Sequence, residues 1–411
     1  MQRVHAVVAA TFFVAPSVRC FFEKVATMQR RFFVSSIAST VASTIASSVL
    51  SLAGVLAAPA AASAQTAPSE PVALRVLTHG SFSLPKDLLA KFEAEHNVKL
   101  NIIKAGSAGE MVNKLILTKA QPLADVAFGI DNTLMPRVRA AGIIEAYTGA
   151  AMQRKSVVSM DDGGKSSDKS SGKTSGTNGS TNGGVVPVDY GYINLNIDKA
   201  WFAKAQMPYP KTMSDLAKPE YAKLLVVQNP ATSSAGQAFL MATIAGLGEQ
   251  AAFDWWAKVR AGGVQVAKGW TEAYNTEFTR NGGTRPIVVS YATSPAAEVF
   301  YSKEKITESP TANLFIKGAV FRQVEGAALI KGGNAQARPA ANKFIEFLRS
   351  PEAQTALQTK MWMYPADAQA TRAEVLQQHG QEPAQFDKLP ASLMDKKAKL
   401  WVQRWVQVVL K

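Results

Sequence analysis

The chain has 411 residues, a formal net charge of +14 and one cysteine. Its 45 lysines and arginines are scattered instead of clustered, which argues against nucleic-acid binding, because nucleic-acid-binding proteins gather basic residues on one surface. The cysteine, Cys20, lies in a segment that we expect to be removed, which excludes thiol catalysis, disulfides and cysteine metal sites from the mature chain. Four histidines and no HExxH or dinucleotide-binding motif leave no basis for predicting a metal or a cofactor.

Residues 1–64 are predicted to be an upstream extension followed by a secretory signal peptide. Arg30 and Arg31 precede a weakly apolar stretch, and Ala62–Ala64 forms an A-x-A cleavage site. A transmembrane anchor is the alternative, but the stretch is rich in Ser and Thr and ends in the cleavage site. Cleavage near Ala64 would export a chain long enough for two packed domains, and we expect it in the periplasm.

Strands and helices are predicted to alternate through the first part of the mature chain. Apolar residues at strand or helical spacing predict strands over 73–82, 98–106 and 124–131, with helices over 85–97 and 108–121. This alternation indicates an α/β fold with a mostly parallel sheet.

Residues 161–184 interrupt this order. The tract holds Gly, Ser, Thr, Asn, Asp and Lys and no apolar side chain, so it is predicted to be a disordered insertion. After it, the sequence predicts an extended segment at 185–202, a strand, turn and helix at 222–248, a helix at 249–263 with Trp255 and Trp256 in the core, a strand at 286–295, one long amphipathic helix at 335–358, and a loop at 361–367.

Small hydroxyl residues follow two of these strands. Thr232–Ser234 lie between a strand and a helix, where hydroxyls and free amides can bind an anion, although one of them could be only a helix N-cap. The segment Tyr291–Ser294 ends a second strand, and the carboxyl ends of strands are where α/β proteins bind ligands. Trp270, after Gly269 in a predicted loop, and Trp362 could offer ring faces to a ligand or close the core.

Ser107 raises a different possibility. It follows a strand in an A-x-S-x-G pattern, close to the nucleophile elbow of serine hydrolases. A hydrolase also needs an acid and a histidine downstream, and only His379 comes late enough. An exported serine hydrolase that uses Ser107 is therefore a distant alternative, and we expect no enzyme activity.

Eight segments together resemble one family: VLTHGSF, AGSAGEMVNKL, ADVAFGIDNTL, VPVDYGYINLNID, NPATSSAGQAFL, KGWTEAY, VSYATSPA and KMWMYPA. Their order and spacing are similar to those of the thiamine-binding periplasmic proteins of ABC importers, which are type II solute-binding proteins. The resemblance implies a two-lobed periplasmic binding protein type II fold, with a hinge of crossover strands and a ligand cleft between the lobes. Lobe 1 would comprise 72–188 and about 298–330, and lobe 2 about 189–297 and 331–411.

The resemblance also implies which residues bind. Trp270 would stack on the ligand rings, and Trp362 would close another side of an aromatic box suited to a cation. Ser233 and Ser234 would lie near the hydroxyethyl or phosphate end of the ligand. The other positions carried over as lining the cleft are Ser107, Ala108, Tyr291, Ala292, Thr293 and Ser294.

Three places depart from the family pattern. Ser107 and Ala108 replace an acidic residue and a glycine, His79 replaces a tyrosine, and Ala297 replaces an aromatic residue. The expected ligand is thiamine, thiamine monophosphate or thiamine diphosphate, and the alternative is another small organic cation, such as a polyamine, or an anion. The resemblance further implies a monomer that delivers its solute to an ABC permease in the inner membrane.

Overall fold

The computed structural model describes residues 70–161 and 184–411. The predicted signal peptide lies outside the described residues, and so does the predicted insertion except for Asp161 and Gly184. Within the two described ranges, no helix is both long enough and apolar enough to cross a membrane.

The strands form one mixed sheet in the order β2-β1-β3-β9-β4-β7-β5-β6, and two short strands, β8 and β10, also pair with β4. Parallel pairing joins β1 to β2 and β3 at one end of the sheet, and β5 to β6 and β7 at the other. The strands are β1 (Val72–Thr78), β2 (Val98–Lys104), β3 (Val126–Asp131), β4 (Val185–Asp198), β5 (Leu225–Gln228), β6 (Gln265–Ala267), β7 (Ile287–Tyr291), β8 (Thr311–Leu314), β9 (Phe321–Leu329) and β10 (Tyr364–Pro365).

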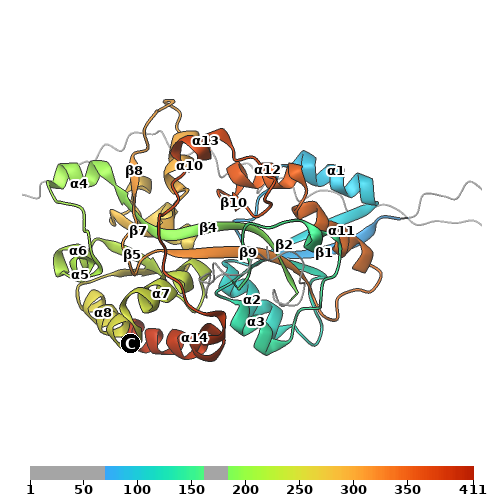
Figure 1. The fold of residues 1–411 in the computed structure, drawn as a ribbon, viewed down its shortest axis with the longest axis horizontal. Helices are drawn as coiled ribbons and strands as arrows, with labels where there is room; N and C mark the ends of the chain where they lie inside the picture. The colour runs from blue at the N-terminus through green and yellow to red at the C-terminus, as the bar shows by residue number, and fades with distance from the viewer. Residues whose placement is uncertain (1–69, 162–183) are drawn as a thin grey trace, which may run out of the picture. The chain divides into compact units, whose positions relative to one another are not determined.

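The helices cover this sheet on both faces (Figure 1). They are α1 (Lys86–His96), α2 (Ala108–Leu117), α3 (Met135–Ala141), α4 (Lys199–Ala205), α5 (Met213–Leu216), α6 (Pro219–Ala222), α7 (Ser234–Leu247), α8 (Glu249–Ala261), α9 (Trp270–Glu272), α10 (Ser294–Phe300), α11 (Arg338–Leu348), α12 (Pro351–Lys360), α13 (Glu374–His379) and α14 (Ala391–Trp405).

Two long antiparallel strands connect the parallel groups and make the fold two-lobed. β9 pairs with β3 of the first group, and β4 pairs with β7 of the second, while β4 and β9 pair with each other between them. Every residue of β4 is buried, including Asp189, Asn194, Asn196 and Asp198 as well as its Val, Ile, Leu and Tyr residues. Figure 1 shows β4 and β9 running across the molecule between the two groups of helices. They are the crossover strands of a type II binding-protein fold.

Each lobe has its own core. In the first lobe, Met111 and Leu115 of α2 pack on one face of the sheet, and Phe92 of α1 packs on the other. In the second lobe, α7, α8 and α14 bury the two helix tryptophans beside β5 and β7, with Trp255 at 5% and Trp256 at 1% exposure. The prediction that these two tryptophans belong to the core is confirmed.

The helix α11 packs differently from the predicted lobe division. Residues 331–411 were assigned to lobe 2, but Phe344 of α11 contacts Phe92 edge-on, with ring centroids 5.5 Å apart, in the core of lobe 1. The apolar face of α11 covers β1 and β9 there, because the chain leaves β9 at its lobe 1 end.

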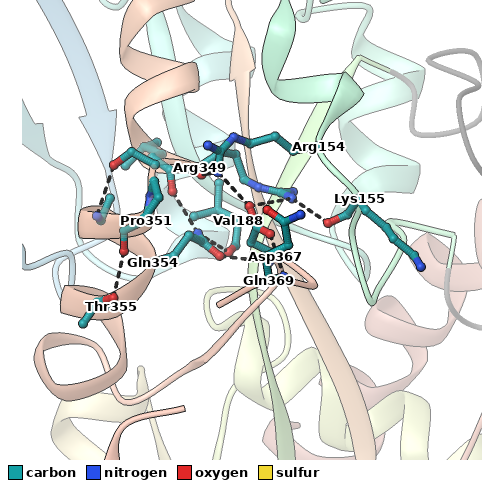
Figure 2. Close-up of polar contacts among 12 residues, drawn as sticks. Arg154, Lys155, Val188, Arg349, Pro351, Gln354, Thr355, Asp367 and Gln369 are labelled. Carbon is teal, nitrogen blue, oxygen red and sulfur yellow. Dashed lines mark hydrogen bonds and ion pairs between the residues drawn. The ribbon is translucent and has the colours of Figure 1, made fainter. Parts of the chain in front are cut away.

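The single helix predicted at 335–358 is wrong, because the structure contains α11 and α12 with a break between them. Pro351 has no amide hydrogen and begins α12, and the Ser350 hydroxyl caps that helix by accepting a hydrogen bond from the Ala353 amide at 3.2 Å. At the break, the buried Arg349 guanidinium donates to the Pro187 carbonyl and lies 3.9 Å from Asp367 (Figure 2). Burial lowers the pKa of Arg349 to about 10, so the guanidinium stays charged beside Asp367 at neutral pH.

The loop predicted at 361–367 contains β10. Tyr364 and Pro365 pair with Tyr190 and Asp189 of β4, so this segment joins the sheet instead of lying free. Gln354 of α12 holds the arrangement by donating to the Val188 carbonyl and accepting from the Asp367 amide (Figure 2). The pairing brings the neighbouring residues 360–363 to the edge of the cleft described next.

Candidate ligand-binding cleft

A cavity of about 940 Å³ lies between the two lobes, a size suited to a small organic molecule. Its walls come from loops that follow β1, β2, β5, β6 and β7, so the carboxyl ends of parallel strands in both lobes face the same space. The segments that line it include His79–Ser81, Gly106–Ala108, Ser233–Ala235, Lys268–Glu272 and Lys360–Met363.

The structure gathers all the predicted site residues around this cavity except Ala292. Ala292 is fully buried behind the wall, where its amide donates to the Tyr192 carbonyl at 2.8 Å. The prediction that Ala292 lines the cleft is therefore wrong, because its side chain lies within the core next to β4.

Trp270 is held on one face and at one edge. Its ring stacks on Tyr274, with centroids 5.0 Å apart and planes 16° apart, and its indole Nε1 donates to the Ser290 hydroxyl at 2.8 Å. Trp270 begins the helical turn α9, so the loop predicted around it is wrong. These contacts fix a half-buried indole at the wall of the cavity, where a ligand ring can stack on it.

The serines before α7 have two roles. The Ser233 hydroxyl caps α7 by accepting from the Gly236 amide at 3.4 Å, so the N-cap alternative holds for this residue. The Ser234 hydroxyl accepts from the Gln323 amide at 2.9 Å. Both also line the cavity, so the N-terminus of a 14-residue helix faces any ligand there.

The hydroxyls after β7 are tied into the protein. The Tyr291 hydroxyl donates to Gln323 Oε1 at 2.9 Å, Thr293 donates to the Trp362 carbonyl at 2.6 Å, and Ser294 is 2.9 Å from Ser290. Burial, with the Glu325 carboxylate close by, raises the pKa of Tyr291 well above its ordinary value, so it remains a neutral phenol. These bonds make a rigid wall.

Trp362 has a positive φ of 60°, which is rare for a large side chain. Its ring packs edge-on against Phe300 and Tyr301, at centroid distances of 5.3 and 5.6 Å. Tyr301 lines the cavity one helical turn beyond Ala297, so it supplies an aromatic ring close to the position where the sequence lacks one. Ala297 and Tyr301 are four positions apart, and residues at this spacing lie on the same face of a helix, so the sequence held a sign of this replacement.

Ser107 faces the cavity, as the binding hypothesis requires. It caps α2, and its hydroxyl contacts the Glu110 carboxylate at 3.2 Å and donates to the Thr232 carbonyl of the other lobe. A serine nucleophile needs a histidine base within hydrogen-bond reach, but His79 pairs with Glu325 and His379 lies in α13. The geometry gives no support to the hydrolase alternative.

Several carboxylates around the cavity were not predicted. Glu110 pairs with Lys268 across the cleft at 2.8 Å, and Glu298 accepts from the Tyr274 hydroxyl at 2.8 Å. Glu325 is only 7% exposed and pairs with His79 at 3.1 Å. Glu325 lies in β9, which also contains Arg322 and Gln323, so no local pattern singled it out. Across the described ranges, no group of three or more His, Cys, Asp or Glu side chains could hold a metal ion.

Comparisons with known proteins agree with this geometry. Residues 121–389 match the family described as bacterial extracellular solute-binding protein. The chain is 30% identical to a thiamine-binding periplasmic protein of Escherichia coli K12 and 31% identical to one of Salmonella typhimurium LT2, with 84% of this chain and 96% of each relative covered. A solved structure titled periplasmic thiamin binding protein superposes with a TM-score of 0.68 at 26% identity, over 82% of this chain and 96% of that one.

Proposed function

The chain belongs to the family of bacterial extracellular solute-binding proteins, and from this premise we propose that it is an ABC-importer receptor for thiamine or its phosphates. The observation that carries the proposal is the interlobe cavity with Trp270 stacked in its wall and carboxylates around it. An aromatic face attracts a delocalised cation such as a thiazolium, and the carboxylates add to that attraction.

The location and the partner follow from the same family. The relatives are named periplasmic, and the N-terminal segment has the sequence pattern of a cleavable export signal. A receptor of this kind collects its solute outside the inner membrane and releases it to a membrane-embedded permease, without changing it chemically. We therefore propose a periplasmic protein with a permease partner and no enzyme activity.

Isothermal titration of the mature protein with thiamine, thiamine monophosphate, thiamine diphosphate and spermidine tests the proposal. We expect saturable binding of at least one thiamine form and weaker binding of spermidine, because a flexible polyamine cannot stack on Trp270. Tight binding of spermidine without binding of any thiamine form would instead support the polyamine alternative, which the cavity carboxylates Glu110, Glu298 and Glu325 also suit.

A further inference from the structure

The floor of the cavity contains a buried histidine–glutamate contact with no role in the site predicted from sequence. Glu325 comes from the crossover strand β9, and His79 follows β1. The Nε2 atom of His79 lies 3.1 Å from Oε1 of Glu325, and the two side chains are only 11% and 10% exposed. Both residues line the cavity, so the small exposed part of each faces the space where a ligand would lie.

The backbone is shaped to hold this pair. Gly129 of β3 has a φ of +111°, and the β3–β9 register shifts between Phe128 and Ile130. A Cβ at position 129 would lie 2.5 Å from the His79 ring, so glycine leaves room for that ring, whereas its 3.4 Å distance from Glu325 Oε1 would be an ordinary contact. The bulge therefore leaves room for the His79 ring beside Glu325.

A second acidic residue lies behind the pair. Asp189 of β4 is directly opposite Glu325 in the β4–β9 ladder and has no exposed surface. Neither of its carboxyl oxygens has a hydrogen-bond donor among the described residues. Burial, and then the neighbouring Glu325, raise the pKa of Asp189 well above its usual range, which favours the protonated form of Asp189.

An ionised carboxylate only accepts hydrogen bonds, and each of its oxygens has two acceptor sites. Nε2 of His79 lies near only one of these oxygens, Oε1, which leaves other acceptor positions of Glu325 able to accept from a ligand on the cavity side. A ligand N–H would be bound there by a charge-assisted hydrogen bond, while a carbonyl oxygen in the same place would be repelled by the carboxylate. The site therefore selects for an amino-bearing group.

We propose that Glu325, oriented by His79 and backed by Asp189, is the ligand-binding group that accepts a hydrogen bond from the amino-substituted ring of the solute. The inference deepens the function proposed above and rests on it. Glu325 would bind the amino group while Trp270 stacks on a ring, so the two residues would recognise different features of one ligand.

The experiment compares thiamine with oxythiamine, in which a carbonyl oxygen attached to the ring replaces the amino group of the pyrimidine. Titration calorimetry gives the ratio of the two dissociation constants for the parent and for Glu325→Gln, Glu298→Gln and Trp270→Ala. We expect the parent to favour thiamine by about ten- to a hundredfold, which is the range for one hydrogen bond to a charged group. The ratio should fall below about threefold in Glu325→Gln, because a glutamine amide can also donate to the carbonyl oxygen of oxythiamine.

The other two variants are controls from the same cavity. Glu298→Gln removes a negative charge elsewhere, and Trp270→Ala removes a ring face, so each should change both affinities by a similar factor and keep the ratio. His79→Phe keeps a ring beside Phe128 but removes the contact with Glu325, and it should lower the ratio partly. This variant keeps the proposal testable if Glu325→Gln does not fold, which its melting curve will show.

A parent protein that binds thiamine and oxythiamine equally well would overturn the inference and leave the proposed function intact. A ratio that survives in folded Glu325→Gln or is lost in Glu298→Gln would also overturn it. A parent that binds no thiamine form would instead overturn the proposed function itself.

Discussion

Replacing Gly109 by alanine should hinder closure of the cleft, and so weaken ligand binding, without lowering the stability of the ligand-free fold. Gly109 lies in the first turn of α2 in lobe 1, and a Cβ there would come within 2.4 Å of the Thr232 carbonyl oxygen of lobe 2. The two lobes would have to part by about 1 Å at this point to reach an ordinary contact distance. A receptor that admits its ligand by opening can tolerate the methyl group when open, but not when closed.

The size of the effect follows from these two states. Overpacking a tight contact costs about 1–3 kcal/mol, here only in the closed form, which predicts roughly a five- to hundredfold weaker affinity for thiamine. In the open form alanine favours the helix over glycine by about 0.5–1 kcal/mol, so the ligand-free melting temperature should stay the same or rise slightly. Titration calorimetry and thermal melts without ligand measure the two quantities.

Gly236→Ala is a matched control. A Cβ at Gly236 of α7 would lie 2.3 Å from the Gln228 carbonyl oxygen, nearly the same overlap, but both residues belong to lobe 2. This variant should lower the ligand-free melting temperature, because opening the cleft cannot relieve a clash within one lobe. If Gly109→Ala lowers that temperature as much as Gly236→Ala does, the lobes do not separate in the free protein and the reasoning is refuted.

Three further predictions use other parts of the molecule. Trp270→Ala should weaken thiamine binding by more than about thirtyfold, since a desolvated cation over an indole contributes about 2 kcal/mol and stacking adds to it. Trp255→Ala removes a core ring that is 5% exposed, and it should instead lower the free energy of unfolding by about 3–5 kcal/mol in urea. If Trp270→Ala leaves thiamine binding unaltered, Trp270 does not stack on the ligand. Because the pKa of Asp189 is raised in the folded protein by burial and by Glu325, its contribution to stability is complete below its unfolded pKa of about 3.9 and is lost as the pH rises toward the folded value. When the pH is raised from about 5 to about 8, the free energy of unfolding in urea should therefore fall less for Asp189→Asn than for the parent. An equal fall in both proteins would contradict the raised pKa of Asp189. Deleting residues 162–183, which hold no apolar side chain, should shift the melting temperature by less than about 3 °C and leave thiamine affinity unchanged, because stability depends only weakly on loop length; a larger shift would show that the segment packs on the fold.

Local sequence patterns determined the elements whose signals lie within a few residues. The alternation between residues 73 and 131 predicted β1, α1, β2, α2 and β3 in the correct order, because strand and helix periodicities are set by neighbouring side chains. The same reasoning put Trp255 and Trp256 in the core, since a helix in an α/β protein buries its apolar face. The hydroxyl residues at strand ends also pointed correctly to the cavity, because the carboxyl ends of parallel strands share an edge.

Only the tertiary structure decided which distant residues meet. Gln323 donates to Asp131, 192 positions away in the chain, and Glu325 contacts His79 over a still longer separation, because β9 crosses back between β3 and β4. No local period records that pairing, so a charged residue in β9 carried no sign of its partner. The helix break at Pro351 is the opposite case. Ser350 and Pro351 are a local signal for a helix start, but the apolar helical period continues through them and predicted one uninterrupted helix. The sequence therefore determined the elements and one edge of the site, and the crossing of β4 and β9 determined its buried floor, because that floor forms only from strands that come together on folding.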